Sequence, residues 1–316
     1  MSAPLRIGTR ASKLALWQAH HVEALLRAQP GAPAVEVVHI KTSGDVQGSV
    51  PLWQVGGRAF FTREIDQALL EHRVDVAVHS LKDLATQLEP GLTLAATLKR
   101  ADPRDALVSR DGRPLAVLPH GARIGTSSLR RRAFLARLRP DVVLTELRGN
   151  VPTRLERLQR GDYDAIVLAA AGLARLGLDG HITEYLPPQE FPPAVSQGVI
   201  GVCARAEDAA TLAGLASLDD PEARLTATAE RALLRRIEGG CQVPLGALAG
   251  VEGGRLRLDA TVCSLDGRRA LTASAEAPAT AAEAAALGVR VAEELLARGA
   301  AELISQQRAA LAVEAP

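Results

Sequence analysis

The sequence predicts a mixed α/β protein, with two α/β units followed by a smaller α+β domain. The chain of 316 residues is too long for one ordinary hydrophobic core and suggests two or three domains of about 100 residues each. Before Pro221, short apolar strand patterns alternate with helical patterns, which is typical of α/β units. After Pro221 come a long amphipathic helix, three strand-like runs and further helix, which indicates a separate α+β domain.

Two proline-containing segments divide the α/β part of the chain. Lys99–Arg104 and Leu186–Gly198 have the composition of crossings between domains. We predict a first domain of residues 1–98 and 199–216, a second of residues 104–192 and a third of residues 221–316. Two units joined by two crossings form a hinge, so we expect the strand ends of both units to face one cleft.

Composition limits the classes of function. Hydrophobic residues make up 47% of the chain without an apolar run long enough to span a bilayer, which predicts a soluble protein. The N-terminal residues lack the apolar stretch and cleavage site of a secretory signal, so we expect a cytoplasmic location. A net charge of +1 and an aromatic content of 3% argue against a nucleic-acid-binding chain.

The cysteines and histidines indicate neither a disulfide framework nor a metal site. Cys203, Cys241 and Cys263 are odd in number and widely spaced, so we expect reduced thiols. His79 and the pair His20-His21 have no partner at metal-ligand spacing, which predicts core or surface roles for them.

The first unit begins with a strand at Leu5–Gly8 and a helix capped by Ser12. The apolar stripe expected along this helix consists of Leu14, Trp17, His21 and Leu25. The next strand, Val35–Ile40, leads through a polar exit at Lys41–Asp45 to a Gly-rich loop near Gly56 that we expect to be mobile.

A helix at Thr62–Glu71 and a buried strand at Val74–Val78 follow, and this strand runs into Lys82 and Asp83. Ligands of open α/β sheets bind at such carboxyl ends of strands. A carboxylate there can stabilise a cation and act as general acid or base, which is the functional interpretation of Asp83. The alternative is a loop aspartate that pairs with Lys82.

The centre of the second unit predicts two helix starts on neighbouring strands. A strand at Ala122–Gly125 is followed by a capping turn at Thr126–Ser128 and a helix at Leu129–Leu138. A second strand at Asp141–Glu146 is followed by a turn and by a helix that begins near Pro152. The free N–H groups of two helix starts favour an anionic ligand.

Arginines stand at both helix starts, where a cation opposes the helix dipole and needs another reason to be there. Anion binding is one such reason, and the set suits a ligand with several carboxylates or phosphates. These residues are Arg130, Arg131, Arg148 and Arg154, and Arg132 reinforces the first helix start. The alternative is a solvated helix face, which is the role we expect for Arg137 and Arg139.

The rest of the chain adds a buried strand and helix at Tyr163–Leu178, which carries Arg175, and a strand at Val199–Ala204. In the third domain we expect a helix at Ala223–Glu238. The remaining expected elements are strands at Leu245–Val251, Arg255–Cys263 and Ala270–Ala277 and one helix from Thr280 to near Arg308. Cys241 follows two glycines on a loop, which makes it a candidate nucleophile or attachment point, with an incidental thiol as the alternative.

Taken together, nine segments resemble the porphobilinogen deaminase family, also called hydroxymethylbilane synthases, over essentially the whole chain. The segments are Arg6–Ala19, Lys41–Asp45, His79–Leu84, Asp102–Ser109, Gly125–Arg132, Leu147–Leu155, Tyr163–Leu178, Pro193–Gly198 and Glu238–Ala247. The resemblance implies three domains, of which the first two are like the lobes of a type II periplasmic binding protein. It also implies a dipyrromethane cofactor joined by a thioether to Cys241.

The family is a group of transferases that join four porphobilinogen molecules head to tail with loss of ammonia, after which water releases hydroxymethylbilane. Each pyrrole carries an acetate and a propionate, so the resemblance implies a multiply anionic ligand. It implies that Asp83 is the catalytic carboxylate that faces cationic intermediates.

The other implied site residues fall into two groups. The cofactor-binding residues are Cys241, Lys82, Ser128, Arg130, Arg131, Arg148 and Gly149. The substrate-binding residues are Arg10, Ser12, Arg154, Arg175 and Gln197. We expect no metal, nucleic-acid or membrane partner and a monomeric enzyme.

The chain departs from the usual family pattern at several positions, which bear on loop mobility, hinge geometry and substrate affinity. They are Gln54, Arg58-Ala59-Phe60, Ala85, Ser196 (usually glycine) and Val202-Cys203. The alternative from another class is a non-catalytic protein that captures a polyanionic metabolite. Asp83 and Cys241 argue against it, because simple binding needs neither a proton-handling carboxylate nor a covalent attachment point.

Overall fold

A computed structural model of the chain describes residues 4–42, 62–237 and 243–313. The predictions for the Gly-rich loop, for Gln54, for Arg58-Ala59-Phe60 and for Cys241 therefore lie outside the described residues. The described chain divides into two compact units. Unit 1 contains residues 4–42, 62–101 and 198–224, and unit 2 contains residues 102–197, 225–237 and 243–313. The expected hinge and cleft between two lobes stay predictions.

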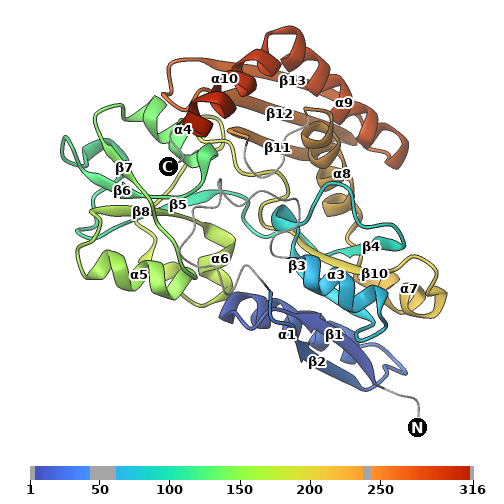
Figure 1. Cartoon of the computed structure of the whole chain (residues 1–316). Helices are drawn as coiled ribbons and strands as arrows, with labels where there is room; N and C mark the ends of the chain where they lie inside the picture. Colours follow the sequence, from blue (N-terminus) through green and yellow to red (C-terminus); the bar gives the residue numbers. More distant parts are fainter. Residues whose placement is uncertain (1–3, 43–61, 238–242, 314–316) are drawn as a thin grey trace. The chain divides into compact units, whose positions relative to one another are not determined.

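Unit 1 is built around a five-stranded sheet of order β2-β1-β3-β10-β4 (Figure 1). The strands are β1 (Leu5–Thr9), β2 (Val35–His39), β3 (Val76–Ser80), β4 (Leu92–Thr97) and β10 (Ile200–Arg205). Strands β2, β1 and β3 are parallel, whereas β10 is antiparallel to both β3 and β4. The apolar side chains of β1, β3 and β10 form the core, as the near-continuous apolar pattern of β3 predicts.

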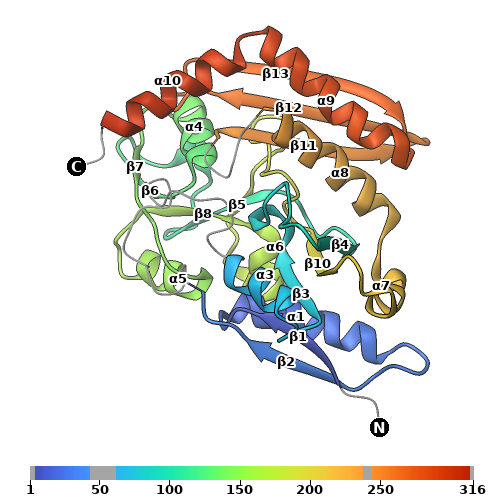
Figure 2. The ribbon, with the colours of Figure 1, turned by 45° about the vertical axis from the view of Figure 1, so that its right-hand side comes forward.

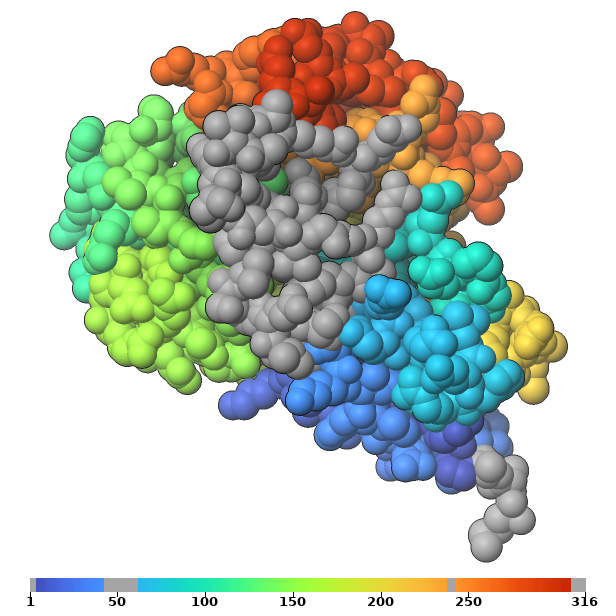
Figure 3. Space-filling model, viewed as in Figure 1, coloured from blue at the N-terminus to red at the C-terminus, as the bar shows by residue number. Residues whose placement is uncertain are grey.

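Helices pack on this sheet. They are α1 (Lys13–Arg27), α3 (Arg63–Leu70), α7 (Ala209–Leu215) and two short 3₁₀ segments, η1 (Leu81–Asp83) and η4 (Ala216–Leu218). Helix α3 buries Ile65, Ala68 and Leu69. Its other face belongs to the visible surface of unit 1, in the light blue region of Figure 3.

The predicted apolar stripe of α1 is wrong. The buried face of the helix consists of Gln18, Ala19, Val22 and Leu26. Trp17 and Leu25 are 37% and 36% exposed, and the ring of Trp17 stacks on His21 with 5.1 Å between the ring centroids. Hydrophobicity alone selected the neighbouring stripe because the true face contains a small alanine and a glutamine. Gln18 is accommodated there because its Nε2 donates a 2.8 Å hydrogen bond to Ser80 Oγ.

Unit 2 contains a second five-stranded sheet with the same pattern, of order β7-β6-β8-β5-β9. The strands are β5 (Asp105–Ser109), β6 (Arg123–Gly125), β7 (Val143–Thr145), β8 (Ala165–Ala169) and β9 (Glu184–Tyr185). Strands β7, β6 and β8 are parallel, and β5 is antiparallel to β8 and β9. The associated helices are α4 (Leu129–Leu138), α5 (Val151–Gln159), α6 (Ala170–Arg175), η2 (Leu115–Val117) and η3 (Asp179–His181).

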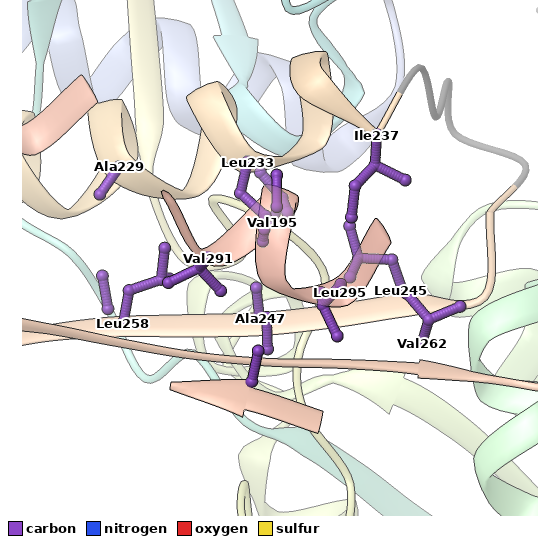
Figure 4. Close-up of a cluster of buried hydrophobic side chains, with 14 of the residues drawn as sticks. Val195, Ala229, Leu233, Ile237, Leu245, Ala247, Leu258, Val262, Val291 and Leu295 are labelled. Carbon is purple, nitrogen blue, oxygen red and sulfur yellow. The ribbon is translucent and has the colours of Figure 1, made fainter. Parts of the chain in front are cut away.

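The C-terminal part of unit 2 contains a three-stranded antiparallel sheet of order β11-β12-β13, with α9 packed along it (Figure 2). The elements are α8 (Pro221–Arg236, which begins at the end of unit 1), β11 (Leu245–Glu252), β12 (Arg255–Cys263), β13 (Ala270–Pro278), α9 (Ala281–Ala297) and α10 (Ala300–Val313). The core of this part joins Leu233 of α8, Ala247 of β11, Leu258 of β12 and Val291 of α9 (Figure 4).

The single C-terminal helix expected from Thr280 to near Arg308 is in fact two helices. They are separated at Gly299, whose φ of +96° no residue with a side chain adopts easily. No helix in the described ranges is long and apolar enough to cross a membrane.

Candidate functional site

One candidate site lies at the carboxyl ends of β1 and β3 in unit 1. Because these strands are parallel and adjacent, the residues that follow them meet at one edge of the sheet. Arg10 and Ser12 follow β1, and Asp83 follows β3 on η1. These three side chains line one pocket, together with His79 and Ser80. Ser12 also caps α1, since its hydroxyl accepts a hydrogen bond from the N–H of Ala15.

Asp83 is exposed within this pocket. Within the described ranges it forms neither an ion pair nor a hydrogen bond, so the alternative expectation of a pair with Lys82 does not hold there. A carboxylate that no cation of the described chain neutralises is available to a cationic ligand. Arg10 places a guanidinium at the same pocket, which can therefore contact both a cationic and an anionic group.

His79 contributes a neutral ring to the pocket wall. Its side chain is buried, and burial together with the nearby charge of Arg10 lowers the pKa of His79 to about 4. The imidazole is therefore uncharged at neutral pH. In the described chain, no group of three His, Cys, Asp or Glu side chains is arranged to hold a metal ion, and the histidines were expected to have core or surface roles.

A second candidate site is a buried ionic cluster in unit 2, formed by Arg130, Arg131 and Asp105. The two arginines occupy the first turn of α4 and are only 5% and 7% exposed, and Asp105 is fully buried. Arg130 Nη2 lies 2.7 Å from Asp105 Oδ2. Arg131 donates to Asp105 Oδ1 from Nε at 3.0 Å and from Nη2 at 2.7 Å. One carboxylate thus binds both guanidinium groups.

Backbone carbonyls and one amide complete the cluster. Arg130 Nη1 donates to the carbonyl of Pro192 at 2.6 Å, and Arg131 Nη1 donates to that of Val167 at 2.9 Å. Gln197 donates from Nε2 to Asp105 Oδ1 at 3.1 Å and to the carbonyl of Pro103 at 2.8 Å. Gln197, expected to bind substrate, is fully buried and lies in this cluster.

The charges of this cluster do not balance. In the described part of the chain, Asp105 is the only carboxylate that pairs with either arginine, so two positive charges face one negative charge. Burial and the neighbouring Arg131 lower the pKa of Arg130 despite the opposing effect of Asp105. An arginine nevertheless stays protonated in proteins, so the excess positive charge persists. Such a cluster attracts an anion.

Sequence reasoning did not identify Asp105. Its only signal was its position within the segment Asp102–Ser109, which contributed to the family resemblance. The expected role of Arg139 also needs correction, because this side chain is held rather than solvated. It pairs with Asp141 at 2.6 Å and donates to the carbonyls of Leu115 and Leu118. Arg137 is exposed, and its Nη1 donates to the carbonyl of Gly267 at 3.4 Å.

The two helix starts of unit 2 are joined directly, as the parallel pairing of β6 and β7 predicts. Ser127 Oγ donates to the carbonyl of Leu147 at 2.6 Å and accepts from its N–H at 3.3 Å. Ser128 is the N-cap of α4, and its hydroxyl accepts from the N–H of Arg131. At the second start, Gly149 has a φ of +108° that its lack of a side chain permits.

The other expected site residues lie outside the pocket of unit 1 and the ionic cluster of unit 2. Arg154 lies in the first turn of α5 and donates from Nε to the carbonyl of Gly149 at 2.7 Å. Arg148 is half-buried in the turn before α5, and Lys82 lies on η1 beside Asp83. Arg175 ends α6, where burial lowers its pKa to about 10.

The fold and these sites together define a class of protein. Two sheets in which three parallel strands are followed by an antiparallel fourth, with the chain crossing twice between them, form the two lobes of a type II periplasmic-binding-protein-like fold. Here the strand ends of both lobes carry cationic groups. Among solved structures, the periplasmic aliphatic sulphonate binding protein SsuA from Escherichia coli aligns with 74% of this chain and 70% of its own chain, with 17% identity and a TM-score of 0.40.

The chain belongs to the porphobilinogen deaminase family. Residues 5–213 match the family described as porphobilinogen deaminase, dipyromethane cofactor binding domain, and residues 224–297 match the porphobilinogen deaminase C-terminal domain. The chain is 53% identical to the porphobilinogen deaminase of Roseiflexus sp. (strain RS-1), over 96% of this chain and 100% of that protein. It is 47% identical to that of Geobacter metallireducens, over 96% and 94% of the two chains.

Proposed function

We propose that this protein is a transferase that joins four porphobilinogen molecules head to tail with loss of ammonia and releases hydroxymethylbilane by hydrolysis. The observation that carries the proposal is Asp83, a carboxylate without an ion-pair partner in the described chain, in one pocket with Arg10. Porphobilinogen carries carboxylates and an aminomethyl group, so it needs both charges in its binding site. A pocket for simple capture of a polyanion has no use for Asp83.

The donor set of unit 2 fits a carboxylate-bearing cofactor. The buried cluster of Arg130, Arg131 and Asp105 has one positive charge in excess, which one acetate or propionate neutralises. Dipyrromethane, when bound, supplies the pyrrole to which the first substrate is joined. We propose Cys241 as its attachment point, and as its binding residues Lys82, Ser128, Arg130, Arg131, Arg148 and Gly149.

Asp83 is the proposed catalytic residue. Its carboxylate stabilises the positive charge that develops when substrate loses ammonia, and it can accept the proton released when the new carbon–carbon bond has formed. Since the His79 ring beside it is neutral, it does not compete for this carboxylate. The proposed substrate-binding residues are Arg10, Ser12, Arg154, Arg175 and Gln197.

The proposal includes the organisation of the protein. We propose three domains, at residues 1–98 with 199–216, 104–192 and 221–316, and the presence of three separate sheets supports this division. We propose a monomeric enzyme of the cytoplasm. Light scattering of the purified holoenzyme tests the monomer, because a dimer would have twice the mass of 33.2 kDa.

The decisive experiment compares Asp83→Asn and Asp83→Glu in single-turnover extension by purified protein. Asp83→Asn keeps the size of the side chain but removes its charge, so extension should nearly vanish. Asp83→Glu keeps the charge but misplaces it by about 1 Å, which should cost on the order of a hundredfold. Asp111→Asn, at an exposed surface pair with Arg113, is the matched control and should extend like the parent.

Intact mass is measured first, because each variant must carry the cofactor. Peptide mapping should find the adduct on Cys241 and not on Cys203 or Cys263, which are buried. A parent protein without any adduct would favour the alternative of a non-catalytic binding protein. Parent-like extension by the Asp83→Asn holoenzyme would instead overturn the role of Asp83 alone.

A further inference from the structure

The buried cluster of unit 2 depends on one residue outside the proposed site set. Asp105 is the first residue of β5, and it pairs in register with Ala169, the last residue of β8. Because β5 is antiparallel to β8, its first residue lies at the carboxyl ends of the parallel strands, where α4 also begins. Asp105 therefore reaches both arginines of the first turn of α4 from a rigid strand.

The equivalent position in unit 1 indicates that the sheet itself does not require this carboxylate. There β10 is the antiparallel fourth strand, and its first residue, Ile200, pairs with Ser80 at the end of β3. Ile200 is buried like Asp105 but belongs to the apolar core. An aspartate at this place in unit 2 thus needs a reason beyond the formation of the sheet.

Asp105 constrains both guanidinium groups. Each arginine makes its pair with Asp105 and one further hydrogen bond to a carbonyl, at Pro192 or Val167. Gln197 holds the shared carboxylate in turn, through a hydrogen bond to Oδ1. With these contacts, neither arginine can turn toward solvent without breaking a buried hydrogen bond.

We propose that Asp105 is a positioning residue for Arg130 and Arg131, and that its single carboxylate sets the cluster one negative charge short of neutrality. The cluster is then completed by one carboxylate of a bound ligand. This inference rests on the proposed function, in which that ligand is the dipyrromethane cofactor. Asp105 acts through the two arginines and has no contact with the reacting atoms in this proposal.

The first test follows cofactor assembly by intact mass after porphobilinogen is added to the folded apoprotein. Asp105→Asn should assemble at least tenfold more slowly than the parent. Asp141→Asn is the matched control, because Asp141 also pairs with a guanidinium in unit 2, but in a balanced pair with Arg139. This control should assemble at the parent rate. Circular dichroism at low temperature establishes that each apoprotein is folded.

A second variant keeps the charge, in case Asp105→Asn does not fold. Asp105→Glu has the same charge but moves the carboxylate by one methylene, so it should fold and still assemble several-fold more slowly. A purely structural role predicts parent-like assembly by folded Asp105→Glu, and that result would overturn the positioning role.

A third measurement detects the excess charge without any turnover. Sodium sulfate should raise the Tm of the parent apoprotein more than sodium chloride of equal ionic strength, because sulfate supplies the missing anion. Arg130→Met makes the cluster neutral and should reduce this difference to the general stabilising effect of sulfate, whereas Arg139→Met should retain the full difference. An equal sulfate effect in parent and Arg130→Met would refute the charge assignment.

Different experimental outcomes would contradict this inference and the proposed function. If the parent takes up porphobilinogen while Asp105→Asn and Asp105→Glu do so equally fast, the function stands and the inference falls. If the parent takes up none but its sulfate effect needs Arg130, the charge assignment stands and the proposed ligand is wrong.

Discussion

The two lobes have the same pattern of strand order but differ in the charge balance of their ion-pair clusters. Unit 1 contains a cluster in which Arg6 and Arg205 face two carboxylates, Asp75 and Asp208. Unit 2 contains the cluster of Arg130, Arg131 and Asp105, in which two guanidinium groups share one carboxylate. The first cluster is balanced and the second is not.

The clusters also lie at opposite ends of their sheets. In unit 1, Asp75 precedes β3 and Arg205 ends the antiparallel β10, so this cluster lies at the amino ends of the parallel strands. There, burial favours the protonated form of Asp75, but the hydrogen bonds from Arg6 and Arg205 outweigh it and lower the pKa of this carboxyl. The unbalanced cluster lies at the carboxyl ends, where ligands bind in such folds. We therefore interpret the balanced cluster at the amino ends as structural. The cluster with excess positive charge at the carboxyl ends is interpreted as a ligand site.

The largest expected effect comes from removing the shared carboxylate. Asp105→Asn leaves two buried guanidinium groups without a counter-charge, so the free energy of unfolding should fall by about 3–5 kcal/mol. Asp208→Asn in the balanced cluster should cost at most about 1 kcal/mol, since Asp208 is partly exposed. Asparagine can also retain the N-cap that Asp208 provides for α7.

Urea unfolding of the two apoproteins measures both effects at one pH. Equal losses in the two variants would remove the distinction between the clusters. A small loss in Asp105→Asn would mean that another group compensates the two arginines.

The fold was predictable because its strands and caps have strong local signals. Helix α4 begins and ends at the predicted residues, since Ser128 caps it and its apolar positions recur at helical spacing. The buried face of α1 was missed because Gln18 becomes compatible with burial only through a hydrogen bond to Ser80, 62 residues away. Local patterns carry no information about such distant partners.

The candidate site was predictable where residues follow a strand, as Arg10 and Asp83 do. It was not predictable at Asp105, which begins a strand. Only the antiparallel insertion of β5 beside β8 brings the beginning of this strand to the ligand end of the sheet. Sequence reasoning identified the arginines there but could not show that one aspartate holds both of them.

The next largest effect is a pH dependence of stability in unit 1. It arises because Asp66 can gain or lose a proton, whereas the arginines of the unit 2 cluster stay charged. Burial, strengthened by Glu89 and opposed by Thr62, raises the pKa of Asp66 to about 6. The unfolded chain loses this proton near pH 4, so the contribution of Asp66 to stability falls as pH rises from 4 to 6. Asp66→Asn removes that loss. The stability of the variant relative to the parent should therefore increase by about 2 kcal/mol between pH 4 and pH 6.

The contribution of His79 to stability should change with pH in the opposite direction. Its pKa of about 4 in the folded protein lies below that of the unfolded chain, so its contribution is complete above pH 6.5 and is lost as pH falls to 4. His79→Gln should thus gain stability relative to the parent at acidic pH. Unfolding by urea at several pH values checks both slopes, with Asp111→Asn as an exposed control. Parallel pH profiles for parent and Asp66→Asn would contradict the prediction.

The smallest expected effect tests a local backbone strain at Ser196 of unit 2, and Gly198 of unit 1 serves as the comparison. At the crossing between the units, Gly198 of unit 1 has a φ of +92°, and an added Cβ would lie 2.5 Å from the carbonyl oxygen of Ala101, so glycine is required there. Ser196 of unit 2 has a φ of +61° despite its side chain. Its hydroxyl is buried without a hydrogen-bond partner in the described structure, although its N–H donates to Glu230 at 2.6 Å.

Ser196→Gly should therefore raise the free energy of unfolding by about 1 kcal/mol, even though glycine gives the unfolded chain more freedom. The left-handed backbone and the unpaired hydroxyl each cost about 1 kcal/mol or more, and the gain in unfolded-state entropy offsets only part of this. Ser196→Ala separates the two causes, because it removes the hydroxyl but keeps the strained backbone, and it should gain less. Thermal unfolding of both variants is the measurement. If Ser196→Gly is less stable than the parent, the serine side chain stabilises the crossing through its packing, and unit 2 holds no strain there for glycine to release.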